Sequence, residues 1–258
     1  VRSFFDSPLL IFVAISFVSA FLTINRVQNL VADPIIYAGG FLLFFLISQS
    51  IKKETSLFSL ANVILASTAV LSLWSLVQII PGLGLDTLRT FSPTGSYLVQ
   101  AMLLVAALPL AVGAYLKSKG RVQALLLIVI VLGIFASAFT VYKNPPVLLD
   151  LETGWKISTG TMGRSITSAV FGMGPANYVD AFTLYKPADF NISKFWNLRF
   201  TGGANFYFYV LSTIGIAGLA ALTVFISKLL VIAKKRLELP GTGSLEKGLI
   251  GSLLIILV

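Results

Sequence analysis

Long apolar runs constrain the fold of this sequence more than any other feature. Seven runs are close to the length of a membrane span, at residues 8–24, 34–51, 56–80, 96–116, 121–142, 204–233 and 248 to the end. Backbone polar groups in lipid must be hydrogen-bonded within the chain, so apolar runs of about 20 residues predict transmembrane helices. Hydrophobic residues are 57% of the chain and charged residues 11%, unlike a soluble domain. We therefore expect an all-α membrane protein, a multi-pass transmembrane helix bundle that forms a single domain over residues 1–258.

Basic residues gather in alternate connections between these runs. One set lies between the second and third runs, between the fourth and fifth, and around the end of the sixth: Lys52, Lys53, Lys117, Lys119, Arg121, Lys228, Lys234, Lys235, Arg236 and Lys247. Short loops rich in Lys and Arg remain in the cytoplasm. The charge pattern therefore predicts a cytoplasmic amino end and places residues 143–203 outside, as one large external loop containing short helices. The net charge is +9, but the basic residues cluster in short connections between apolar runs, as residues that orient a membrane protein do. We therefore do not expect nucleic acid as a partner.

Cysteine and histidine are both absent from the sequence. Disulfides and thiolate metal sites are therefore excluded, and the commonest general base and metal ligand is missing. The carboxylates of residues 143–203 show no paired spacing that would indicate acid–base catalysis. We expect no metal and no cofactor, and no catalytic residue can be named. The chain starts at Val1 and stops inside an apolar run, which indicates a piece of a longer protein truncated at both ends.

Residues 143–203 hold most of the side chains with chemical potential. Residues 153–171 have scattered apolar positions typical of a helix lying at the membrane interface, although two glycines weaken that pattern. A Gly-Met-Gly-Pro turn follows at residues 172–175, and Pro175 is suited to open a short helix through Phe182. Glycines there permit a close backbone approach to a ligand.

An aromatic and basic segment, YKPADFNISKFWNLRF, completes this loop at residues 185–200. Two interpretations stay open for it: a surface that binds lipid headgroups, or sugars and phosphates, and an interfacial aromatic belt with snorkelling cations. Arg89, in the turn-rich loop at residues 81–96, has two interpretations as well. It is either a solvated charge in a connecting loop or an anion contact, because its guanidinium suits phosphate.

The order of these elements resembles the O-antigen ligase / polysaccharide polymerase family of membrane glycosyltransferases. The resemblance rests on RTFSPTGSYLVQAMLLVAALPLA at residues 89–111, FGMGPANYVDAF at 171–182 and ANFYFYVLSTIGIAGL at 204–219. It implies a bacterial cytoplasmic (inner) membrane protein with a periplasmic loop. The implied partners are membrane lipids, a lipid-linked glycan donor on undecaprenyl diphosphate, and a glycan or lipid acceptor.

The resemblance also implies a set of substrate-binding residues. Those are Arg89, Arg164, Gly172, Gly174, Asn177, Lys186, Trp196, Arg199 and Asn205, with the two first-named arginines holding the diphosphate. The family's histidine position falls on Ala204, and Thr213 stands where many members have an acidic residue. Three hypotheses follow. The first is a glycosyltransferase involved in polysaccharide biosynthesis of the cell envelope, the second is a non-catalytic transporter or scaffold for envelope glycolipids, and the third is a structural membrane subunit whose aromatic loop docks a partner.

Overall fold

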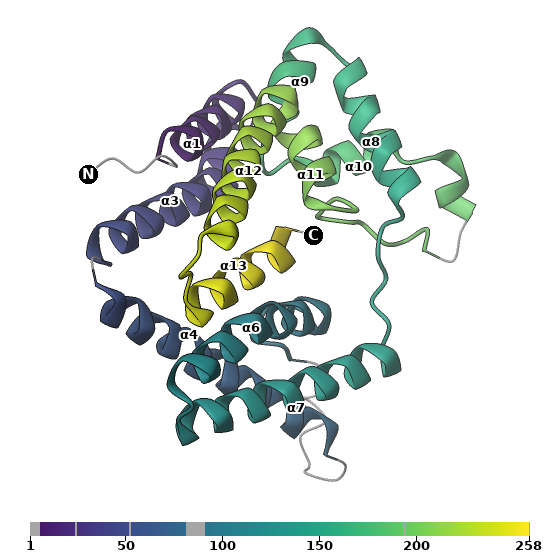
Figure 1. Cartoon of the computed structure of the whole chain (residues 1–258). Helices are drawn as coiled ribbons and strands as arrows, with labels where there is room; N and C mark the ends of the chain where they lie inside the picture. The colour runs from purple at the N-terminus through teal and green to yellow at the C-terminus, as the bar shows by residue number, and fades with distance from the viewer. Residues whose placement is uncertain (1–5, 24, 52, 81–90, 193–194, 258) are drawn as a thin grey trace. The chain divides into compact units, whose positions relative to one another are not determined.

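The computed structural model describes residues 6–23, 25–51, 53–80, 91–192 and 195–257, and these contain helices but no β-strand (Figure 1). Five helical stretches in this part are long and apolar enough to cross a membrane. They are Arg26–Ser50, α4 (Glu54–Ile79), α6 (Tyr97–Ser118), α7 (Arg121–Lys143) and α12 (Gly215–Glu238). The prediction of an all-α membrane protein is confirmed at this level.

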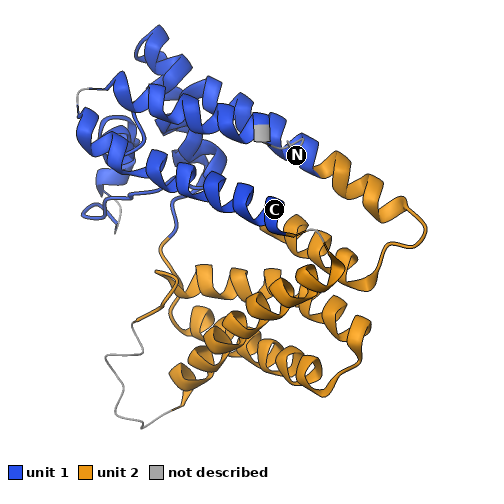
Figure 2. Ribbon diagram, turned by 90° about the vertical axis from the view of Figure 1, so that its left-hand side faces the viewer, with its two compact units in different colours: residues 1–50, 148–229 blue, residues 51–147, 230–258 orange. Residues whose placement is uncertain are grey.

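The chain divides into two compact units (Figure 2). Unit 1 comprises residues 1–50 and 148–229, and unit 2 comprises residues 51–147 and 230–258. Unit 1 contains α1 (Asp6–Phe21), α2 (Arg26–Val31), α3 (Asp33–Ser50), α8 (Leu151–Gly163), α9 (Ile166–Phe171), α10 (Tyr178–Tyr185), the 3-10 helix η1 (Ala188–Ile192), α11 (Phe206–Thr213) and most of α12. Unit 2 contains α4, α6, α7, the end of α12 and α13 (Ser244–Leu257).

Several predicted boundaries are wrong. Residues 204–233 are not one helix, because the chain breaks between α11 and α12, where Gly215 has a φ of +79°. Residues 153–171 form two helices, α8 and α9, with Arg164 in the turn between them. The short helix α10 starts at Tyr178, three positions after the predicted Pro175. The last helix, α13, starts earlier than predicted, at Ser244.

Unit 2 is held together by helix packing and by buried polar side chains. Gly133 of α7 lies so close to α4 that a Cβ there would be 2.3 Å from the Cβ of Ser72. The Gln100 amide donates to Ser75 Oγ at 2.6 Å, and Ser137 Oγ donates to the same atom at 2.8 Å. Small residues and interhelical hydrogen bonds of this kind hold membrane helices together, since lipid supplies no hydrophobic driving force between them.

Candidate functional site

The glycine-rich turn at residues 172–174 packs on the break between α11 and α12. The last carbonyls of α11 have no intrahelical partner. The Met173 N–H donates to the Ser212 carbonyl at 3.0 Å, and the Gly174 N–H donates to the Thr213 carbonyl at 2.9 Å. Residues 172–174 therefore cap the end of α11, and the same hydrogen bonds hold the backbone of these residues in place.

Two glycines make this backbone-to-backbone contact possible. Gly172 has a φ of +74°, and a Cβ there would lie 2.3 Å from the Thr213 carbonyl carbon. Gly215, also at positive φ, would place a Cβ 2.4 Å from the Val170 carbonyl oxygen. The close approach that these glycines permit is therefore to the chain itself, while their contact with a ligand stays a prediction.

An asparagine pair ties the next residues of the turn to α2. The buried Asn29 accepts from the Ala176 N–H at 2.8 Å, and its amide nitrogen lies 3.5 Å from Asn177 Oδ1. Asn177 in turn donates to the Met173 carbonyl at 2.7 Å. A Cβ on Gly174, whose φ is +104°, would lie 2.7 Å from Asn29 Oδ1. Asn29, Gly174 and Asn177 thus form one interlocked cluster.

Tyr209 of α11 completes the connection. Its hydroxyl lies 2.8 Å from the Pro175 carbonyl oxygen and also hydrogen-bonds the Asp33 carboxylate, so its single proton serves either acceptor. Burial, reinforced by the hydrogen bond to Asp33, raises the pKa of Tyr209. Burial alone raises the pKa of Tyr178, whose ring centroid is 5.4 Å from that of Tyr209, to about 12. A raised pKa means that burial disfavours the phenolate form of both side chains.

Replacing Asn29 with alanine is expected to destabilise the chain by about 2 kcal/mol. The change leaves the Ala176 N–H without its acceptor in a partly buried place, and an unsatisfied buried group costs about 1–3 kcal/mol. Thermal unfolding of the purified chain in detergent measures the effect. Gln28→Ala is the matched control, because Gln28 is the exposed neighbour on the same short helix. Equal unfolding temperatures for the two variants would contradict the assigned role.

Arg164, Trp196 and Arg199 are the predicted substrate-binding residues that the structure leaves exposed in unit 1. Arg164 occupies the turn between α8 and α9, and Trp196 is 65% exposed. Their side chains are accessible to a ligand, whereas Gly172, Gly174 and Asn177 are buried or partly buried. Whether Arg164, Trp196 and Arg199 bind a substrate stays a prediction.

Lys186 and Asn205 are occupied within the protein. The Lys186 ammonium lies over the rings of Phe182 and Phe190, 5.5 and 5.3 Å from their centroids, in cation–π geometry. Phe200 also packs against Phe182, so part of the aromatic segment faces inward while Trp196 faces outward. Asn205 caps α11, because its Oδ1 accepts from the Phe208 N–H at 2.8 Å. Both contacts stabilise the fold.

Ala204, at the position where the resemblance expects histidine, packs beneath α8. A Cβ added to Gly154 would lie 2.7 Å from the Ala204 Cβ, and Ala204 joins the cluster around Ile157, Tyr178 and Phe182. Gly154 and Ala204, both small, allow α8 to lie close to this part of the chain.

Arg89 and residues 81–88 and 90 lie outside the described residues. The residues directly after them are anchored within unit 2. The Phe91 carbonyl accepts from the Gln78 amide at 2.7 Å and from the Trp74 indole at 3.2 Å. Ser92 donates to Gln100 Oε1 at 2.9 Å, and Ser96 caps α6. A cavity of about 270 Å³ lies beside this loop, lined by Ser92, Gly95, Ser96, Tyr97, Leu98, Asn144 and Pro146.

Asn29, Asp33 and Tyr209 are site residues that sequence reasoning missed. Asn29 and Asp33 lie in a stretch interpreted as a connection, and Tyr209 lies inside an apolar run. The polar Asn25–Asn29 pair next to a membrane-length run was the available signal. In the described part of the chain, no group of three or more His, Cys, Asp or Glu side chains is arranged to hold a metal ion.

Comparisons with known proteins provide no guide to the function of this chain. No family model, no curated protein and no solved structure matches the chain.

Proposed function

We propose that this chain acts on a lipid-diphosphate-linked glycan at the outer face of a bacterial inner membrane, as a transferase of the O-antigen ligase type. The observation that carries the proposal is a contact between two segments on which the resemblance rests. Residues 173–175 hydrogen-bond the carbonyls of Ser212 and Thr213 and the hydroxyl of Tyr209. Motifs about 30 residues apart in sequence thus form one folded element.

The chemistry follows from the proposed substrate. An acceptor hydroxyl attacks the anomeric carbon, the bond from that carbon to the diphosphate oxygen breaks, and the lipid diphosphate leaves with the electron pair. Negative charge develops on the leaving group, where a positioned guanidinium is most stabilising. Arg164 is exposed on unit 1 and offers a planar fork of donors for that charge. No histidine within these 258 residues takes the acceptor's proton, because the sequence contains none.

A second candidate function has its own supporting observation. Ala204 stands at the position of the family histidine and is packed against α8, leaving no imidazole at the carboxyl end of the loop. This favours a protein that binds or moves envelope glycolipids without transferring them. Both candidates share the lipid-linked glycan as ligand and differ in whether a new glycosidic bond forms.

Reconstitution separates the two functions. The purified chain is placed in vesicles with a radiolabelled undecaprenyl-diphosphate glycan and a mixture of candidate acceptors. Label appearing on an acceptor supports transfer, and label bound to the chain without a new product supports the glycolipid-binding function. If the chain neither binds nor consumes more lipid-linked glycan than protein-free vesicles, both proposals fail.

A further inference from the structure

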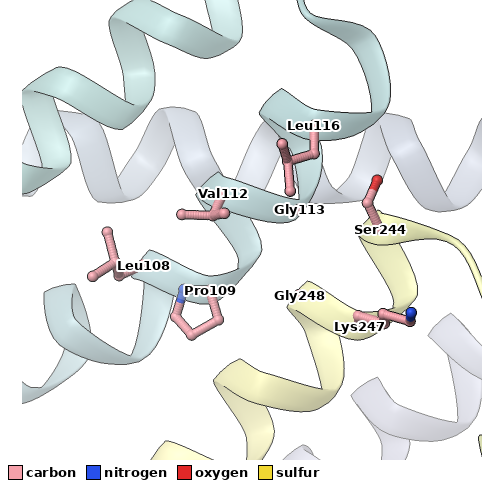
Figure 3. Close-up of a pocket in the computed structure, with 8 residues that line it drawn as sticks. All are labelled: Leu108, Pro109, Val112, Gly113, Leu116, Ser244, Lys247 and Gly248. Atoms are coloured by element: carbon pink, nitrogen blue, oxygen red, sulfur yellow. The ribbon is translucent and has the colours of Figure 1, made fainter. Parts of the chain in front are cut away.

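A groove of about 590 Å³ lies between α6 and α13 in unit 2 (Figure 3). Its lining residues are Leu108, Pro109, Val112, Gly113, Leu116, Ser244, Lys247 and Gly248. The α6 side is wholly apolar, and the α13 side contributes a hydroxyl and an ammonium (Figure 3). The groove thus combines a hydrocarbon wall with a single positive charge.

The helices α6 and α13, which form the two sides of the groove, pack closely against each other. A Cβ on Gly248 would lie 2.5 Å from the Pro109 carbonyl oxygen, and one on Gly113 would lie 2.5 Å from the Ser244 carbonyl oxygen. Pro109 interrupts the hydrogen bonding of α6. The N–H of the next residue, Leu110, donates to Ser252 Oγ on α13 at 3.1 Å. The two helices are therefore held together at one crossing, and the groove is preformed beside it.

Lys247, which lines the groove, differs from Lys117 at the end of α6 in its charge partners. Lys117 pairs with Glu54 and lies 5.4 Å from the centroid of the Phe58 ring, so its charge is already matched. Lys247 is exposed, and none of the ion pairs found among the described residues involves it. A negative group placed at the groove would gain an attraction that the protein itself does not satisfy.

We propose that this groove binds an anionic phospholipid, with an acyl chain along Leu108, Val112 and Leu116 and the phosphate at Lys247 and Ser244. The basic residues around the end of α6 predict that this end faces the cytoplasm. The cytoplasmic leaflet is rich in anionic lipids, and each Lys or Arg near such a surface contributes about 1 kcal/mol. A lipid satisfies both the apolar wall and the charge, whereas a free phosphate leaves the wall empty.

The test is native mass spectrometry of the delipidated, purified chain titrated with phosphatidylglycerol or phosphatidylcholine of the same acyl length. Phosphatidylglycerol should bind about five-fold more tightly, the ratio that about 1 kcal/mol represents. Lys247→Gln should remove this preference, and Lys235→Gln, which changes an exposed lysine away from the groove, should retain it.

A second pair of variants tests the apolar wall. Val112→Phe fills the groove and should weaken both lipids, whereas Val105→Phe should not, since Val105 has a similar exposure (39% against 38%) outside the lining. Leu116→Trp, at a side chain that is 53% exposed, repeats the test should Val112→Phe unfold. Equal binding of the two lipids by the unmodified chain, or unchanged preference in Lys247→Gln, overturns the proposal. Undiminished binding by the groove-filling variants also overturns it.

Discussion

Gly172→Ala is expected to lower the stability of the chain by about 2–4 kcal/mol. The φ of +74° is itself unfavourable for a residue with a side chain. The added Cβ would also lie 2.3 Å from the Thr213 carbonyl carbon and 2.4 Å from its oxygen, and backbone atoms cannot move aside as a flexible side chain can. Relief of this contact requires the turn to leave the broken end of α11, which releases two backbone hydrogen bonds together.

Thermal unfolding in detergent, with Gly163→Ala as the control, measures this effect. Gly163 ends α8, its φ is not positive, and a Cβ there would meet no atom within 4 Å. Alanine replaces glycine in both variants, so the difference between them isolates the local geometry. Similar unfolding temperatures for Gly172→Ala and Gly163→Ala would show that the turn is not held as described.

The long apolar runs predicted the membrane class and the approximate positions of most of the long apolar helices, because the hydrocarbon thickness sets a length that the sequence displays directly. The runs did not reveal where a helix breaks. Residues 204–233 read as one span, and yet Gly215 interrupts them at positive φ. A glycine in an apolar run is usually compatible with a helix, and the reason for this break is a contact with residues 170–174 of a distant segment. Sequence periodicity contains no information on that contact.

Only part of the candidate site could be predicted, because contacts between distant segments of the chain are again not visible in the sequence. Gly172, Gly174 and Asn177 were singled out together, and the structure brings them into one turn. Their partners Asn29 and Tyr209 come from elements roughly 150 residues away and 30 residues away, and only folding reveals the pairing. Lys186 was selected by charge, and its position over two phenylalanine rings follows from the aromatic cluster formed around it.

Arg164→Ala is expected to reduce turnover of a lipid-linked glycan in reconstituted vesicles by about 100- to 1,000-fold, the range for removing one preorganised group that stabilises developing charge. Arg164 is exposed in the turn between α8 and α9, where a diphosphate can reach its guanidinium. Because charge on the diphosphate grows as the glycosidic bond breaks, kcat should fall more than KM rises. Arg164→Lys should recover part of the rate by restoring the charge without the bidentate fork.

Lys156→Gln is the control for this variant. Lys156 lies on α8, eight positions before Arg164. Its pKa is raised by its hydrogen bond to Glu152, with which it pairs at 2.6 Å. An exposed ion pair of this kind contributes little to the stability of the fold, so Lys156→Gln should leave the chain folded. We therefore expect its turnover to stay near that of the unmodified chain, although one positive charge is lost. Equal losses in the two variants would mean that the overall charge of residues 143–203 matters and that Arg164 has no specific role. Unchanged turnover in Arg164→Ala would exclude the arginine from the reaction and leave glycolipid binding as the function to pursue.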